Sequence, residues 1–307
     1  MKLTGLHLLL SYQCTFECDH CFVWGSPKQS GTFTLESIRR VLLQARDLGS
    51  IDWVYFEGGE PFLYYATLLQ GTRLAASMGF HVGIVTNCYW AVGFEDAYEA
   101  LAPYIGLVQD LTVSSDLYHY DEKISQQARI IEDVAHQLDI PISIISIAQP
   151  DDIKASKVTG QLPEGESGVM YRGRAAVNLA PQAIHYPWDS FNECPYEDLR
   201  NPSRIHLDSF GNLHICQGIT IGNLFQSTLK EICESYKADR HPVISALLHG
   251  GPVELARRFD INHAAEYADA CNMCYEIRRE LRSRFPAILK PDQMYGVLPL
   301  DQINIKT

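Results

Sequence analysis

The feature of this chain that most constrains its fold is an alternation of short apolar runs with helix-like stretches in its first half. Each run is apolar, most contain β-branched residues, and each is preceded or followed by ten or more residues of helical character. Such alternation is typical of βα units that build a parallel sheet. The runs span residues 6–10, 53–56, 82–85, 111–113 and 142–147, and we expect a shorter sixth strand at residues 169–171, after the glycine-containing stretch 160–168.

The number of these units limits the fold class. Five or six units in about 180 residues are fewer than the eight of a complete barrel, which takes about 250 residues. The sequence therefore predicts an α/β fold with a partial barrel or an open twisted sheet.

The alternation stops near residue 190, where a second kind of organisation begins. Residues 204–207 and 213–216 flank a polar turn, which predicts a hairpin, and Thr228 and Glu231 stand at capping-box spacing before a helix. We expect a barrel domain over residues 1–188, a smaller α+β domain organised around a metal over residues 189–290, and a C-terminal tail over residues 291–307.

The charge balance narrows the choice of partners. The net charge is -12 and the chain has no run of lysines and arginines, so neither a nucleic acid nor an anionic membrane is expected as the main partner. No segment approaches the roughly 20 apolar residues that span a bilayer. We expect a soluble cytoplasmic protein that acts on a small molecule or a peptide.

Polar and unusual residues follow the predicted strands rather than precede them. Cys14 follows the first, residues 57–61 (EGGEP) the second, residues 86–88 (TNC) the third, and residues 114–116 (SSD) the fourth. Ligands of parallel α/β folds bind at the carboxyl ends of the strands. These four segments should therefore line one opening at the carboxyl ends of the strands.

The cysteines form two groups whose spacing is typical of metal ligands. A reducing cytosol keeps thiols free, and nine cysteines are an odd number, so a disulfide framework is not expected. Cys14, Cys18 and Cys21 can converge on one centre. Zinc in a structural site and iron–sulfur clusters normally take four ligands, so three thiolates leave an open position. Spacing alone does not separate zinc from iron.

The pairing of two motifs resembles the radical SAM superfamily, whose enzymes use S-adenosylmethionine (SAM). The motifs are Cys14-x3-Cys18-x2-Cys21 after the first strand and Gly58-Gly59-Glu60-Pro61 after the second. The resemblance runs from about residue 2 to residue 180. It implies a partial (β/α)6 TIM-like barrel, a [4Fe-4S] cluster on the three cysteines, and SAM bound to the open iron. It also implies reductive cleavage of SAM to a 5'-deoxyadenosyl radical, with electrons from a low-potential donor such as flavodoxin or ferredoxin.

The same resemblance assigns expected roles to single residues. His20 stands near the adenine, Asn87 and Ser114 near the ribose or carboxylate of SAM, and Arg172 in a Gly-Arg element after the sixth strand, with Arg174 beside it. The GGEP segment would offer backbone acceptors to the SAM amino group. Two residues depart from the family pattern: Glu57 replaces a small or hydroxylated residue, and Cys88 stands where an Asn-Gly turn is more common.

The second cysteine group resembles the SPASM/Twitch auxiliary iron–sulfur domains. Its members are Cys194, Cys216, Cys271 and Cys274. The shorter Twitch form, with one auxiliary [4Fe-4S] cluster on four cysteines, accounts for all four, although the gap from Cys194 to Gly211 is slightly long for the pattern. Structural zinc is the alternative. Cys233 is expected to be a core residue.

Together these resemblances imply a radical SAM enzyme that modifies a peptide or protein side chain. One alternative is a small-molecule radical dehydrogenase, for which Glu57 or Asp116 is a candidate base. Another is a non-catalytic iron–sulfur electron carrier or a zinc-stabilised binding protein. Cys88 can return a hydrogen atom to a substrate radical or be a buried turn residue, and Asp116 can contact SAM or substrate or cap a helix.

Overall fold

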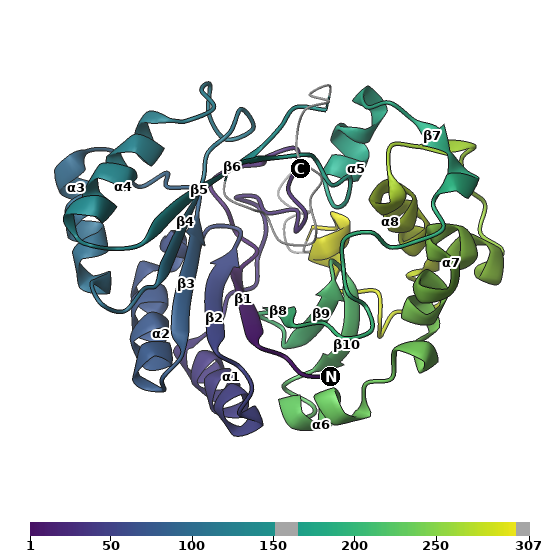
Figure 1. The fold of residues 1–307 in the computed structure, drawn as a ribbon, viewed down its shortest axis with the longest axis horizontal. Helices are drawn as coiled ribbons and strands as arrows, with labels where there is room; N and C mark the ends of the chain where they lie inside the picture. The colour runs from purple at the N-terminus through teal and green to yellow at the C-terminus, as the bar shows by residue number, and fades with distance from the viewer. Residues whose placement is uncertain (151–164, 299–307) are drawn as a thin grey trace, which may run out of the picture.

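The centre of the molecule is one nine-stranded sheet, seen in a computed structural model that describes residues 1–150 and 165–298. The strand order is β10-β9-β8-β1-β2-β3-β4-β5-β6 (Figure 1). Strands β1 to β6 are parallel, with helices between them, which confirms the predicted α/β partial barrel. The six strands are β1 (Gly5–Ser11), β2 (Trp53–Gly58), β3 (His81–Thr86), β4 (Asp110–Ser114), β5 (Ile142–Ile147) and β6 (Gly165–Ser167).

The intervening helices cover the outer face of the sheet (Figure 1). They are α1 (Leu35–Leu48), α2 (Tyr65–Ser77), α3 (Phe94–Leu101) and α4 (Gln126–Gln137). Helix α1 shows why they form: Thr34 caps its first turn, Gly49 ends it in the left-handed region at φ 73°, and Ile38, Val41 and Leu42 are buried. Packing of such apolar faces against the strands fixes the strand ends in space.

The predicted sixth strand is displaced in the sequence. Strand β6 lies at Gly165–Ser167, where it pairs with the end of β5, and the expected residues 169–171 form no strand. The chain turns away from the sheet there, because the Tyr171 amide donates to Asp269 Oδ2 at 3.3 Å instead of to β5. Of the glycine-containing stretch 160–168, residues 160–164 lie outside the described residues.

The C-terminal part of the chain continues the same sheet beyond β1. Strand β8 (Arg204–Asp208) pairs parallel with β1, and β9 (Asn212–Cys216) and β10 (Ile219–Asn223) follow antiparallel. The predicted hairpin at residues 204–216 is confirmed, and it joins the barrel sheet. The division at residue 188 stays a prediction.

The remaining helices pack beside this edge. They are α5 (Ala175–Asn178), α6 (Leu229–Ser235), α7 (Pro242–Phe259) and α8 (Ala270–Leu281), with the two-strand pair β7 (Tyr186–Pro187) and β11 (Glu266–Tyr267). The short 3-10 helices are η1 (Pro61–Tyr64), η2 (Ala102–Tyr104), η3 (Ala180–Gln182), η4 (Trp188–Ser190), η5 (Ala238–Arg240) and η6 (Asp292–Tyr295). Within the predicted tail 291–307, η6 is packed in the core, and residues 299–307 lie outside the described part.

Two hydrophobic cores meet at β1. One lies between the barrel strands and helices α1 to α4. The other joins Leu9, Tyr12 and Val23 to helices α7 and α8. Cys233 is buried in the first core, against the barrel helices.

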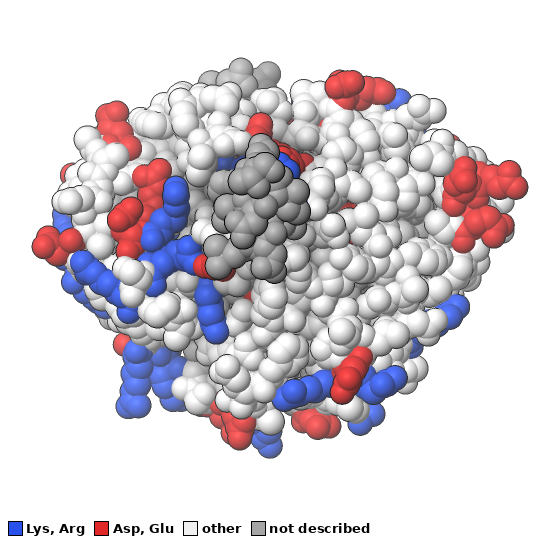
Figure 2. Space-filling model, turned by 180° about the vertical axis from the view of Figure 1, so that it is seen from behind, with Lys and Arg blue, Asp and Glu red and all other residues white. Residues whose placement is uncertain are grey.

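The surface carries charges of both signs. Figure 2 shows acidic and basic side chains near one another around the rim of one face, with mostly uncharged side chains over its right half inside the rim. Within the described ranges, no helix is both long and apolar enough to cross a bilayer.

Candidate functional site

One pocket of about 260 Å³ opens at the carboxyl ends of the barrel strands. The four segments that follow the first four strands meet there, as the strand-end pattern predicts. Ten of the candidate residues line it, namely Cys14, Cys18, His20, Cys21, Glu57, Gly58, Gly59, Asn87, Ser114 and Arg172. The pocket is thus the place where the sequence motifs converge.

The first three cysteines lie on the loop between β1 and α1, and donors point at two of their sulfurs. The Gly25 amide donates to Cys21 Sγ at 3.2 Å, and Asn87 Nδ2 lies 3.5 Å from Cys14 Sγ. Burial raises the pKa of the Cys14 thiol to about 12, and burial together with the neighbouring Cys21 and Cys14 raises the pKa of Cys18. Such thiols keep their protons unless a metal replaces them. The donor set therefore fits a cationic iron centre.

The spacing of these sulfurs bears on which metal group fits. A tetrahedral zinc ion with Zn–S bonds of about 2.3 Å holds its sulfurs about 3.8 Å apart. In the described residues, two groups of side chains have three potential ligand atoms that all lie within 4.8 Å of one another. Cys14, Cys18 and Cys21 form neither of these groups. At least two of these three sulfurs therefore lie farther apart than the ligands of one tetrahedral zinc ion.

The segment after β6 clamps the cysteine loop. The Arg174 amide donates to the Cys21 carbonyl at 2.9 Å, and its buried guanidinium donates to the carbonyls of Cys18 and Gly25. Gly173 adopts φ +62°, and a Cβ there would lie 2.6 Å from the Cys21 carbonyl oxygen. The Arg-Gly-Arg element thus holds the loop in shape, a role that sequence reasoning missed.

The two glycines of the GGEP segment allow close backbone packing and also line the pocket. A Cβ on Gly58 would lie 2.4 Å from the Ser11 carbonyl oxygen, and one on Gly59 would lie 2.1 Å from that of Gln13. The glycines are therefore required where β2 passes the cysteine loop. Pro61 is buried at the start of η1. Neither Pro61 nor Glu60 is among the described residues that line the pocket.

The buried Glu60 carboxylate holds the residues that follow β3 in place. Its carboxylate accepts from the Phe62 amide, from Thr86 Oγ1 and from the Asn87 amide at 2.8–2.9 Å. Burial raises its pKa to about 7, although these donors oppose the shift. Glu60 therefore positions Asn87, which lines the pocket.

Asp116 lies behind two histidines that face the pocket. Its Oδ2 is 3.2 Å from His20 Nε2, and its Oδ1 is 2.8 Å from His119 Nδ1. It also accepts from the backbone amides of Tyr118, His119 and Ile147. Burial raises the pKa of Asp116, but the two histidines outweigh burial and the net shift is downward. The geometry gives Asp116 a positioning role toward His20 and His119, which do line the pocket.

Cys88 is a buried turn residue. Its side chain is fully buried, its φ is +54°, and its Sγ lies 3.8 Å from the Tyr120 hydroxyl. Among the described residues that line the pocket, Cys88 is absent. This placement does not support its predicted role as a hydrogen-atom donor.

The second cysteine group converges on a smaller pocket beside the first. Cys216 ends β9, Cys271 and Cys274 lie one turn apart on α8, and Cys194 follows η4. Burial, then the nearby Cys216 and Cys274, raises the pKa of Cys194 to about 12. A Cβ on Gly251 would lie 2.4 Å from the Glu193 amide nitrogen, so this glycine lets α7 support the Cys194 loop. The structure thus brings all four predicted ligands together.

Two buried arginines flank these thiols. Arg172 lines both pockets. Its Nη1 donates to Glu197 Oε1 at 3.0 Å and lies 3.7 Å from Cys216 Sγ, and its guanidinium stacks over Phe22. Arg278, which sequence reasoning missed, lines the second pocket and donates to the Cys274 carbonyl. Arg172 therefore stands between the two cysteine groups rather than in the first pocket alone.

Comparison with known proteins finds a family similarity for the part of the chain that carries the first cysteine group. Residues 8–151, just under half of the chain, match the family described as the Radical SAM superfamily. This part of the chain is therefore similar to a radical SAM superfamily domain.

Three similar proteins illustrate the range of relatives. YydG of Bacillus subtilis (strain 168), named for peptide biosynthesis, is 27% identical over 203 residues, which are 62% of this chain and 63% of that protein. An S-adenosylmethionine-dependent nucleotide dehydratase of Fibrobacter sp. (strain UWH6) is 24% identical over 122 residues, 38% of this chain and 34% of that protein. A crystal structure of BtrN in complex with AdoMet and 2-DOIA aligns with 13% identity and a TM-score of 0.49, over 76% of this chain and 82% of that one. The chain matches less than two thirds of the length of either curated relative.

Proposed function

We propose that this chain is a radical SAM enzyme whose first pocket holds a [4Fe-4S] cluster on Cys14, Cys18 and Cys21 together with SAM. The observation that carries the proposal is the convergence of these thiols with Gly58, Gly59 and Asn87 on one pocket. When bound, the cluster and SAM supply a 5'-deoxyadenosyl radical that takes a hydrogen atom from the substrate.

The protein's own groups prepare the pocket for this chemistry. Donors from Asn87 and Gly25 to the cysteine sulfurs stabilise thiolates and lower the electron density on them. The backbone of Gly58 and Gly59 presents acceptors for the amino group of SAM. His20, held by Asp116, offers a ring face for the adenine, and Ser114 offers a hydroxyl that lines the same pocket.

We further propose an auxiliary [4Fe-4S] cluster on Cys194, Cys216, Cys271 and Cys274. Four thiolates around such a cluster carry net negative charge, and Arg172 and Arg278 supply buried positive charge beside it. A structural zinc ion in the same four thiolates is the second candidate. Four protein ligands leave no open position, which favours a role in electron transfer.

The substrate class that we propose is a peptide or protein side chain. The support is the likeness to YydG, whose name assigns it to peptide biosynthesis. A small-molecule substrate is the second candidate, and the likeness to a nucleotide dehydratase supports it. A low-potential donor such as flavodoxin or ferredoxin would supply the electrons.

Electron paramagnetic resonance (EPR) tests the cofactor part of the proposal. Anaerobically reconstituted, dithionite-reduced protein should give a cluster spectrum that changes when SAM is added, because SAM binds the open iron. Cys18→Ala should lose the SAM-dependent change, whereas Cys233→Ala, which removes a core thiol outside both pockets, should keep it. A wild-type spectrum with full iron that saturating SAM leaves unchanged would contradict the proposal.

A further inference from the structure

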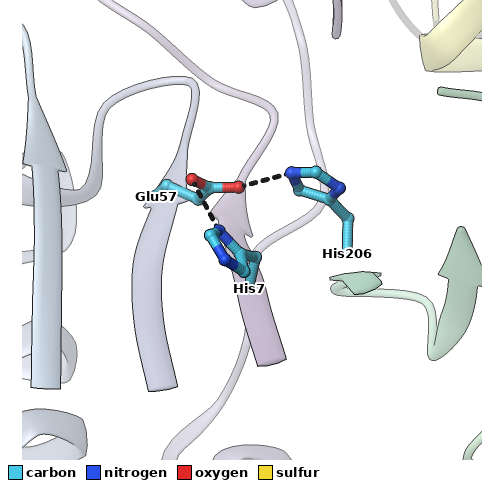
Figure 3. A group of neighbouring side chains, drawn as sticks. All are labelled: His7, Glu57 and His206. Carbon is cyan, nitrogen blue, oxygen red and sulfur yellow. Dashed lines mark hydrogen bonds and ion pairs between the residues drawn. The ribbon is translucent and has the colours of Figure 1, made fainter. Parts of the chain in front are cut away.

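A third group of potential ligands, none of them cysteine, lies deeper in the first pocket. His7 on β1, Glu57 on β2 and His206 on β8 point toward one another (Figure 3). His7 is the register partner of His206 across β1 and β8, and Glu57 pairs with Leu9, two residues beyond His7 on the same face. Three neighbouring strands therefore hold the three side chains on rigid backbone.

The distances within this group fit ligation of one ion, and one of its two contacts with Glu57 is also a hydrogen bond. His7 Nδ1 is 3.3 Å from Glu57 Oε2, His206 Nε2 is 3.0 Å from Glu57 Oε1, and the ligand atoms all lie within 4.8 Å of one another. Glu57 Oε1 is a buried oxygen whose contact with His206 is an ion pair and not one of the hydrogen bonds of the structure. A buried carboxylate oxygen without a donor is costly and requires a partner.

A metal ion accounts for both the spacing and the missing hydrogen bond. Two ligand atoms about 2.1 Å from one ion lie roughly 3.0 Å apart at a right angle and roughly 3.4 Å apart in a tetrahedron. The observed separations of 3.0 and 3.3 Å match these values. We propose that His7, Glu57 and His206 bind one divalent transition-metal ion, separate from both cysteine groups.

The residues around this group favour metal binding and indicate what else the ion would bind. The Tyr55 ring stacks on His7 with centroids 4.6 Å apart, and its hydroxyl donates to Asp110, which fixes the orientation of His7. Two imidazoles and one carboxylate suit zinc or iron(II) and leave coordination positions open toward the pocket. Arg204 lines the same pocket, so the open positions fit an anionic oxygen donor, such as a carboxylate of the substrate.

A second compact group of potential ligands in this pocket differs from the group around Glu57, because its hydrogen bonds are complete. His20, Asp116 and His119 also have ligand atoms within 4.8 Å of one another. Both oxygens of Asp116 accept hydrogen bonds from backbone amides or histidines. This group is satisfied without an ion, so the proposal is confined to the group around Glu57.

Zinc binding tests the proposal without reliance on catalysis. Cluster-reconstituted protein is dialysed to equilibrium against Zn²⁺, and zinc and iron are counted in the same sample by mass spectrometry. We expect wild type to hold about one zinc per chain with its iron unchanged, and Glu57→Gln and His206→Ala to weaken zinc binding by about 10- to 100-fold or more. His119→Ala removes a potential metal ligand from the same pocket outside the group, and should bind zinc like wild type.

Three results would overturn the proposal: no zinc bound by wild type, equal zinc binding in Glu57→Gln and wild type, or loss of zinc in His119→Ala but not in His206→Ala. The iron count reports folding in each sample. Glu57→Gln is nearly isosteric, so it decides the question if His206→Ala does not fold.

Discussion

Arg174 donates from its guanidinium to the backbone carbonyl of Cys18 at 2.8 Å, across 156 residues of sequence. A second bond from the same group reaches Gly25 at 2.7 Å. The segment after β6 therefore closes over the loop that carries the first cysteines, and the shape of that loop depends on one buried cation.

Replacing this arginine should open the loop. Arg174→Ala removes two buried hydrogen bonds from a charged group, at a cost of about 1.5–3 kcal/mol for each, so we expect the first cluster to be lost. Iron per chain after anaerobic reconstitution measures this loss. Arg200→Ala, which removes an exposed ion pair with Asp239, should retain full iron. Full iron in Arg174→Ala would show that the clamp is dispensable.

Removing an auxiliary cysteine should halve the iron. Two [4Fe-4S] clusters contain about eight irons per chain, so Cys274→Ala should retain about four. The remaining cluster should still respond to SAM, because the first pocket does not include Cys274. Cys233→Ala is the matched control. If wild type itself holds about four irons and Cys274→Ala loses a zinc ion that wild type retains, the auxiliary site is a zinc site.

Glu60 should make stability depend on pH. Its pKa rises from 4.5 in the unfolded chain to about 7 in the folded protein. Its contribution is therefore fully present below pH 4.5 and is lost as the pH rises through 7, by up to about 3 kcal/mol. The free energy of unfolding should fall less between pH 5 and pH 8 in Glu60→Gln than in wild type. The same pH dependence in both proteins would contradict the shift.

Cys88→Ala separates the two interpretations of this thiol. Because the thiol packs against Tyr120 away from the pocket, we expect a loss of stability of about 1 kcal/mol and the same product as wild type, by mass spectrometry. The sequence-based hypothesis of hydrogen-atom return predicts retained SAM cleavage with a changed product. A changed product would restore that hypothesis.

The sequence predicted those features that depend on local patterns. The alternation of apolar runs gave the parallel strands, and the spacing of Cys14, Cys18 and Cys21 after the first of them placed a cysteine loop at the mouth of the barrel. The position of the sixth strand along the chain was predicted less well. The contact of Tyr171 with Asp269, 98 residues away, draws the chain off the sheet after β6.

The features that sequence reasoning missed depend on distant pairings. His206 meets His7 and Glu57 only because β8 adds to the edge of β1, about 200 residues earlier in the chain. Nothing in the local pattern around His206 indicates that pairing. The roles of Arg174 and Arg278 are hidden for the same reason, since their partners lie on other elements.

Reductive cleavage of SAM is the direct measure of the central claim. Anaerobically reconstituted protein is reduced with dithionite, supplied with SAM and assayed for 5'-deoxyadenosine by mass spectrometry, beside Cys18→Ala. We predict that the nucleoside forms with wild type and that Cys18→Ala forms none above background. Wild type with full iron and bound SAM that forms no more 5'-deoxyadenosine than Cys18→Ala would contradict the claim.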